Sequence, residues 1–278
     1  MSNKLLQLKF AIPPRPEVLL RLSAIVEQHD PDIDLVISII REDPGLYSMV
    51  LSTVNAPCFG LRRTITSLSH SVMLLGLPRL FKLIKLALIK STLRNTISME
   101  RFWDTASEVA LIIHDLTQKY TDLDPDVAYS IGMLHDSGIP LIMQIDKDYK
   151  DILRMANSHS QMELTKIEQE RYGIDHFSLG ARLVKEWKMP SDIYNTIELQ
   201  ASFPEVIKIN KERADDCLMY LALLSVAKDI SQSYRHYWRL EKNELIPQAI
   251  LISIEYIGLC DYDYMDLKEE FLAKLNSI

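Results

Sequence analysis

Glycine is scarce in this chain. Its 278 residues include only 8 glycines, where an average usage of roughly 7 % would give about 19. Glycine adopts the positive-φ backbone of tight turns more readily than any other residue, so a chain with few glycines makes few such turns. This scarcity weighs against β-sandwiches, β-barrels and glycine-rich phosphate loops. The apolar residues follow helical spacing, without sustained alternation of apolar and polar positions, and the sequence therefore predicts an all-α fold.

Helix starts are marked along the chain by prolines and by capping side chains. Asp43-Pro44 and Asp124-Pro125 each place an N-capping carboxylate before a proline at the first helical position, where no N–H is needed. The sequence shows no tandem repeat, low-complexity segment or long linker, so separately folding domains are not required. We expect helices over about residues 16–30, 46–55, 67–75, 79–93, 99–120, 125–135, 160–172, 175–187, from 190 onward, and over 215–234, 244–256 and 264–275.

Charge, cysteines and hydropathy together indicate where the protein works. The net charge of −7, from 31 Lys and Arg against 38 Asp and Glu, makes direct nucleic-acid binding unexpected. The cysteines, Cys58, Cys217 and Cys260, are far apart and form no C-x-x-C pair, which is typical of a reducing cytosol. No uncharged apolar run approaches the roughly 18 residues of a membrane span. We expect a cytoplasmic protein without a membrane span.

Basic residues are concentrated in one segment. Between Pro44 and Met99 the chain has no acidic residue, and it has seven basic ones, which are Arg62, Arg63, Arg79, Lys82, Lys85, Lys90 and Arg94. One interpretation is an anion-binding surface for a nucleotide or a phosphorylated partner, with Arg62 and Arg63 at its tip. The other interpretation is a core helix whose lysines extend their ammonium groups to solvent.

Five segments of the sequence together form a recognisable pattern. Their order and spacing identify a protein family far more specifically than a lone His-Asp pair would. They are IPPRPEVLLRL, the block from Asp43 to Leu77, FWDTASEVA, GMLHDSGIPLI and YGIDHFSLGARLVKEWKMP. Over about residues 10–210, the chain resembles the HDOD family, the HD-related output domains of bacterial signalling proteins. The resemblance implies an all-helical fold related to the HD-domain metal-dependent phosphohydrolases, which hold a metal between helices.

The resemblance also implies a domain organisation. It predicts an HDOD domain over residues 10–210, with N-terminal helices to about residue 95 and an HD-like core from about residue 98. Residues 211–278 are expected to form C-terminal helices that complete the core and pack on it. Members of the family often lack a complete metal site and are thought to act in signal relay.

An HD-type metal site combines a His from one helix, a His-Asp doublet from a second and an Asp from a third, because imidazole and carboxylate together hold a divalent ion and its activated water. The resemblance assigns the doublet to His135-Asp136, the last Asp to Asp229, and a nearby histidine of the family to His176. The first His falls on Thr105, whose neutral hydroxyl is a poor ligand. The predicted metal site therefore lacks at least one ligand.

Neighbouring positions offer alternatives. The carboxylate of Asp104, beside Thr105, is an alternative ligand, and a further histidine or histidine pair of the family falls on Gln200 and Ala201. Three roles stay open for the doublet: stabilising buried helix ends, binding a metal with a substitute ligand, and recognising a partner or small molecule.

The sequence also suggests structural roles for two further candidate site residues, His176 and Asp229. His176 follows the capping residue Asp175, which favours a structural role. Asp229 lies on the inward side of an apolar helix, and a lone buried carboxylate is costly, so we expect it to pair with His135.

These observations lead to one hypothesis and two alternatives. We expect a non-catalytic bacterial signal-transduction protein with a degenerate HD-type site, which binds a signalling protein partner and needs no cofactor. One alternative is a phosphohydrolase that uses a divalent metal at His135, Asp136, His176 and Asp229 to act on a nucleotide or cyclic dinucleotide. The other is a regulatory module that binds an anion or nucleotide through the basic segment 62–94.

Overall fold

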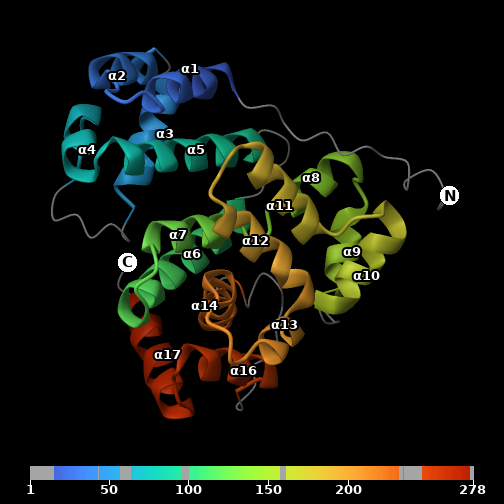
Figure 1. Cartoon of the computed structure of the whole chain (residues 1–278). Helices are drawn as coiled ribbons and strands as arrows, with labels where there is room; N and C mark the ends of the chain where they lie inside the picture. Colours follow the sequence, from blue (N-terminus) through green and yellow to red (C-terminus); the bar gives the residue numbers. More distant parts are fainter. Residues whose placement is uncertain are drawn as a thin grey trace. The chain divides into compact units, whose positions relative to one another are not determined.

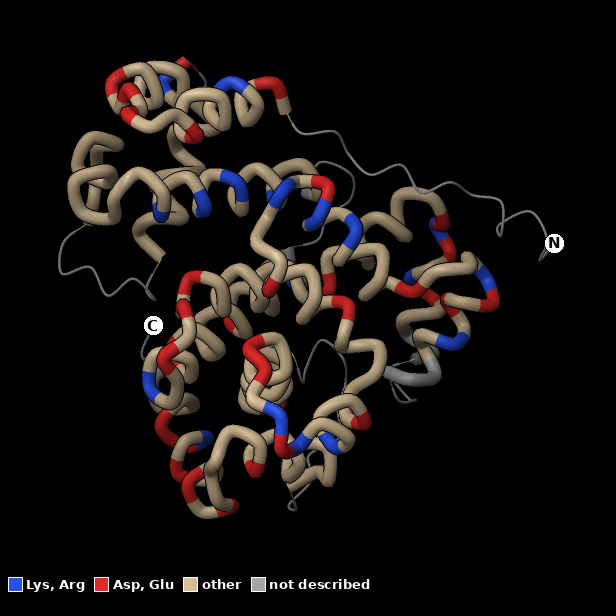
Figure 2. The backbone as a smooth tube through the Cα atoms, in the orientation of Figure 1, with Lys and Arg blue, Asp and Glu red and all other residues tan. Residues whose placement is uncertain are grey.

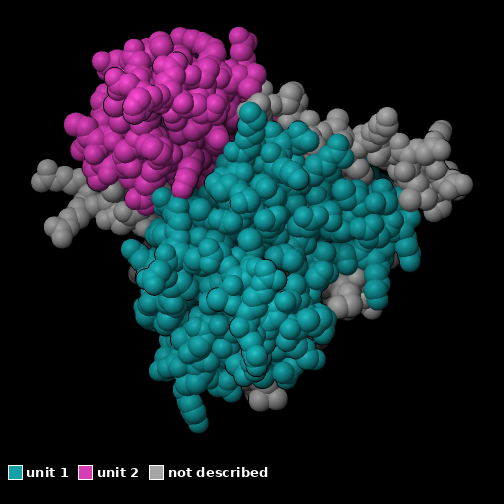
Figure 3. Space-filling view, viewed as in Figure 1, with its two compact units in different colours: residues 1–12, 96–278 teal, residues 13–95 magenta. Residues whose placement is uncertain are grey.

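The computed structural model describes residues 16–42, 44–56, 64–94, 100–156, 161–231, 234 and 246–275. These residues form helices and no strand (Figure 1), which confirms the all-α prediction. They belong to two compact units, one within residues 13–95 and the other reaching from residue 96 to the C-terminal helices (Figure 3).

The N-terminal unit is a bundle of short helices. Ser67 caps one of them by accepting a hydrogen bond from the His70 N–H, at the start of the helix expected over residues 67–75. Gly76 ends that helix with a φ of +75°, a conformation that glycine adopts without strain. The helices are α1 (Glu17–Val26), α2 (Ile33–Arg41), α3 (Pro44–Val54), α4 (Leu68–Leu75) and α5 (Leu77–Arg94).

Helix α2 was not predicted from the sequence. Asp32 begins it by accepting a hydrogen bond from the Leu35 N–H at 2.9 Å. The preceding Asp30-Pro31 pair indicated only the end of the first helix, and it hid the capping residue that follows directly. The helix then buries an apolar face that includes Val36 and Ile40.

Helix α5 carries most of the described basic segment, and Figure 2 shows Lys and Arg without Asp or Glu along it. Its apolar side chains, such as Leu80 and Ile84, are fully buried. Lys82, Lys85 and Lys90 are half-buried, as expected of lysines that cover apolar surface with their methylene stems. Arg62 and Arg63 lie outside the described residues.

The C-terminal unit is built around α7, whose residues from Asp126 to Leu134 are all buried. Asp124 caps it by accepting from the Asp126 N–H at 2.9 Å, as the Asp-Pro pair predicted. The helices are α6 (Glu100–Tyr120), α7 (Pro125–Leu134), α8 (Gly138–Ile145), α9 (Tyr149–Ala156), α10 (Gln161–Tyr172), α11 (His176–Glu186), α12 (Ser191–Leu199), η3 (Gln200–Ser202), α13 (Glu205–Ile209), α14 (Asp216–Ile230), α16 (Gln248–Ile257) and α17 (Asp261–Leu275).

Close packing of α6 on α7 depends on Gly132. A Cβ atom at this position would lie 2.4 Å from Ala110 Cα, closer than real Cβ atoms approach backbone. The absence of a side chain therefore lets two helices of the core meet at their backbones, three residues before His135. In the part of the chain that the structure describes, no helix combines the length and the apolar character needed to cross a membrane.

Candidate functional site

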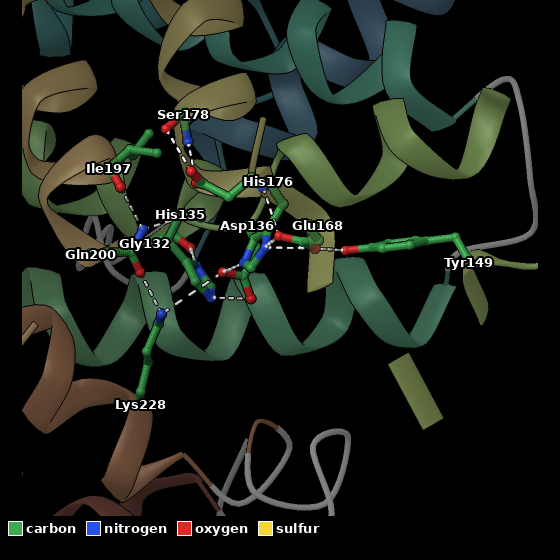
Figure 4. Close-up of polar contacts among 11 residues, drawn as sticks. Gly132, His135, Asp136, Tyr149, Glu168, His176, Ser178, Ile197, Gln200 and Lys228 are labelled. Atoms are coloured by element: carbon green, nitrogen blue, oxygen red, sulfur yellow. Dashed lines mark hydrogen bonds and ion pairs between the residues drawn. The ribbon is translucent and has the colours of Figure 1, made fainter. Parts of the chain in front are cut away.

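His135, Asp136 and His176 lie together inside the C-terminal unit (Figure 4). His135 is the C-cap of α7, and Asp136 follows it in the turn that leads to α8. His176 is the first residue of α11, after the capping Asp175. The three side chains are at most 3 % exposed, so the structure joins three of the residues that the sequence proposed for one site.

Both imidazole rings are fixed through Nδ1. His135 Nδ1 donates to the Gly132 carbonyl at 2.6 Å, and His176 Nδ1 lies 2.7 Å from Glu168 Oε2. Their Nε2 atoms face Asp136, at 3.2 Å from Oδ2 for His135 and 4.0 Å from Oδ1 for His176. Neither Nε2 nor Asp136 Oδ1 makes a hydrogen bond, although all three atoms are buried.

Glu168 is the residue that holds His176 in place. It lies on α10 and is fully buried. Its carboxylate accepts from both the ring and the backbone N–H of His176, the latter at 3.0 Å. It also accepts a hydrogen bond from the Tyr149 hydroxyl. Burial and the charge of Glu168 raise the pKa of Tyr149, so the phenol stays protonated and remains a donor.

Lys228 of α14 brings a positive charge into the same site. Its Nζ lies 3.8 Å from Asp136 Oδ1 and donates a hydrogen bond to Gln200 Oε1. Gln200 in turn donates through Nε2 to the His135 carbonyl at 2.9 Å and to the Ile197 carbonyl at 3.2 Å. Gln200 thus occupies a position where the family resemblance expected histidine, and it links Lys228 to the doublet.

The pKa shifts follow from this arrangement of charges. Burial alone would raise the pKa of Asp136, but the charges of His135 and Lys228 outweigh it and hold that pKa well below its ordinary value. Burial alone would lower the pKa of His176, but Glu168 outweighs it and raises that pKa. Burial lowers the pKa of Lys228, and the charge of Asp136 opposes that shift. The geometry pairs Lys228 with Asp136 at 3.8 Å and His176 with Glu168 at 2.7 Å.

Thr105 is buried, but its hydroxyl is already used within its own helix. Thr105 Oγ1 donates to the Arg101 carbonyl at 2.7 Å. Asp104 is exposed, so its carboxylate does not face the buried site, and the expectation that Asp104 could replace the missing histidine is wrong.

Asp229 does not pair with His135, which corrects a second expectation. Asp229 Oδ2 accepts from Lys268 Nζ at 2.8 Å and from the Tyr264 hydroxyl, both on α17. His135 uses Nδ1 for Gly132 and makes no hydrogen bond through Nε2. Of the adjacent residues Lys228 and Asp229, the lysine faces the doublet and the aspartate joins α14 to α17.

The arrangement does not fit a divalent metal. Two imidazoles and a carboxylate are typical metal ligands, but in the described part of the chain no group of three or more His, Cys, Asp or Glu side chains is placed to hold an ion. The ammonium of Lys228 lies beside the carboxylate that would have to be the central ligand. Like charge opposes a divalent cation there.

The sequence missed Glu168, Tyr149 and Lys228 as site residues. Glu168 lies in a polar helix where nothing in the local pattern separates a buried glutamate from an exposed one. Lys228 had a visible signal, because it is a charged residue in the otherwise apolar stretch LALLSVAKDIS. A lysine at such a position is rarely buried without a partner, and this rule could have predicted an acidic neighbour.

Asp146 anchors the helix that carries Glu168. Its Oδ2 accepts from the Tyr172 hydroxyl at 2.7 Å and from Arg171 Nε at 2.9 Å, both at the end of α10. Burial opposes ionisation of Asp146, but the hydrogen bonds from Tyr172, Arg171 and the Asp148 N–H outweigh it and lower the pKa of Asp146. Its charged form is therefore the one that stabilises the fold.

We expect Asp146→Asn to lower the free energy of unfolding by about 2 kcal/mol at neutral pH, because it weakens hydrogen bonds to a charged, buried group. The pKa of Asp146 in the folded state lies below its ordinary 3.8, so the stabilisation is complete above that value and is lost as the pH falls through the lower, folded-state pKa. Urea unfolding should therefore show a smaller deficit below pH 3.8. An equal deficit at both pH values would contradict this role, and the exposed Asp122→Asn provides the control.

Comparison with known proteins agrees with this fold. A crystal structure described as "Putative phosphohydrolase", from Shewanella amazonensis SB2B, is 21 % identical with a TM-score of 0.68, covering 94 % of this chain and 90 % of that one. An HDOD domain protein of unknown function from Geobacter sulfurreducens is 22 % identical with a TM-score of 0.65, covering 96 % of this chain and 89 % of that one. At such identities these likenesses show the fold alone.

Sequence comparison identifies the family. An uncharacterized protein of Treponema pallidum (strain Nichols) is 24 % identical over an alignment of 207 residues that covers 69 % of this chain and 38 % of that protein. This chain therefore spans well under half the length of that relative. The family model of the HDOD domain matches residues 12–203, close to the segment that the five motifs marked. The chain belongs to the HDOD family.

Proposed function

We propose that this protein is a non-catalytic signal-transduction protein of the bacterial cytoplasm, and that it acts by binding a signalling protein partner. The observation that carries the proposal is the state of Thr105. At the position of the first HD histidine, its hydroxyl is buried and donates to the carbonyl of Arg101 in its own helix. Metal-dependent hydrolysis requires a metal that activates water, and this position supplies no ligand for one.

The environment of the remaining HD residues also supports the proposal. Asp136 has the internal ammonium of Lys228 as a neighbour at 3.8 Å, and the Asp229 carboxylate is held by Lys268 at 2.8 Å. In a hydrolase both carboxylates would need to be available to the metal. Here Asp136 and Asp229 instead connect helices to one another. Signal relay, the role that the family resemblance implies, is then the function that we assign to this chain.

Hydrolysis assays test this proposal. We expect no turnover of bis-p-nitrophenyl phosphate or cyclic dinucleotides above that of the Asp136→Asn variant, with Mg²⁺, Mn²⁺, Fe²⁺, Co²⁺ or Zn²⁺ supplied in turn. Metal-dependent turnover that is lost in Asp136→Asn, but retained when the exposed Asp104 is changed to Asn, would overturn the proposal. That result would favour the metal-dependent phosphohydrolase instead.

A further inference from the structure

We propose that the ammonium group of Lys228 is the built-in cation of this site, and that it balances the buried Asp136 carboxylate in place of a metal ion. The family resemblance gives Lys228 no role in the site. It goes beyond the proposed function, because it states what holds the degenerate site in its present arrangement.

The surroundings of the Lys228 ammonium are those of a cation site. Its Nζ lies 3.8 Å from Asp136 Oδ1 and donates to Gln200 Oε1. The aromatic rings of Phe177 and Tyr234 are also neighbours, with their centroids 5.5 and 5.3 Å from Nζ. A carboxylate, an amide oxygen and aromatic faces all attract a positive charge. The lysine side chain is 11 % exposed, so water contributes little to its solvation.

The negative charge of the buried Asp136 carboxylate needs compensation, and Lys228 contributes to it. A buried carboxylate that is 3 % exposed needs a positive partner. His176 already faces Glu168 at 2.7 Å, and Glu168 is fully buried, so the charges of these two residues offset each other. Two groups then face the Asp136 carboxylate: the ring of His135, with Nε2 at 3.2 Å from Oδ2, and the Lys228 ammonium, with Nζ at 3.8 Å from Oδ1. Both charges favour the ionised carboxylate, and Lys228 is the one that reaches it from another helix.

The same contacts join three parts of the chain. Lys228 belongs to α14, Asp136 to the turn after α7, and Gln200 to the short helix η3 that follows α12. Gln200 extends the connection by donating to the carbonyl of His135 at 2.9 Å and to that of Ile197 at 3.2 Å (Figure 4). The internal cation therefore fixes the doublet against two helices, a task that a metal performs when it draws ligands from separate helices.

A double-mutant cycle tests the pairing. We expect Lys228→Met and Asp136→Asn each to lower the melting temperature by about 10 °C, because each leaves one member of a buried ion pair without its partner. The double variant should lose much less than the sum, because both charges are then absent. Strictly additive losses, or a Lys228→Met protein as stable as the wild type, would overturn the proposal.

Lys185→Met is the matched control. Lys185 is exposed, and its Nζ lies 5.5 Å from the Tyr194 ring, so it has an aromatic neighbour and, among the described residues, no ion pair with a buried carboxylate. We expect this variant to melt within about 2 °C of the wild type.

Chemical labelling of the wild-type chain keeps the proposal testable if a variant does not fold. Reductive dimethylation followed by peptide mass spectrometry should modify Lys185 quickly and should leave Lys228 unmodified until the protein is unfolded. Modification of Lys228 at the rate of Lys185 would contradict its burial beside Asp136. The outcome is independent of the hydrolysis assays, so this inference and the proposed function can fail separately.

Discussion

Glu168→Ala is expected to lower the free energy of unfolding by about 4 kcal/mol, the size of effect seen when one member of a buried ion pair is removed. The change deletes the acceptor for the ring and backbone N–H of His176 and for the Tyr149 hydroxyl. Tyr149 and His176 are both buried, so each loses a hydrogen bond in the folded state. Urea unfolding followed by circular dichroism measures the loss.

Glu170→Ala is the matched control for this variant. Glu170 lies on the same helix, α10, and is exposed. We expect a change within about 0.5 kcal/mol. If Glu168→Ala were no more destabilising than Glu170→Ala, then Glu168 would not be the residue that positions His176.

Gly138→Ala is expected to destabilise the protein by about 3 kcal/mol through overpacking. A Cβ atom at Gly138 would lie 1.9 Å from the carbonyl oxygen of His176 and 2.7 Å from its carbonyl carbon. Both are backbone atoms at the start of α11, so no side-chain rotation relieves the clash. Accommodation requires α8 and α11 to move apart, and that movement displaces His176 from Asp136.

Two measurements separate this clash from a general effect of alanine. Gly45 is exposed in the first turn of α3, and Gly45→Ala should be neutral or slightly stabilising because alanine favours helix. In Gly138→Ala the ring resonances of His176 should also shift in an NMR spectrum. Unchanged stability together with unchanged His176 resonances would show that the close approach of the two backbones is not required.

The helices that carry a local start signal could be predicted from the sequence. Asp124, Asp175 and Ser67 each cap a helix at the predicted position, because capping depends on a residue and its immediate neighbours. The short helices α8 and α9 were missed. Both helices begin a few residues after the preceding helix ends. Helix α8 also contains Pro140, and a proline inside an apolar segment usually indicates that a helix is interrupted.

The candidate site could be predicted only in part. His135, Asp136 and His176 were marked by the family motifs, and the structure brings them together. The orientation of Lys228 and Asp229 could not be predicted, because α14 is buried on nearly every side and its apolar pattern does not mark a single inward face. Which of two adjacent charged residues meets the doublet depends on the neighbouring helices, and this information is not local in sequence.

We propose that the charges of this site balance within the chain and that the site holds no divalent metal. Equilibrium dialysis of the wild-type protein against divalent cations, followed by elemental analysis, tests it most directly, with Asp136→Asn measured in parallel. We predict that the wild type retains no more metal than Asp136→Asn. One equivalent of a divalent metal per chain, present in the wild type and lost in Asp136→Asn, would contradict this proposal.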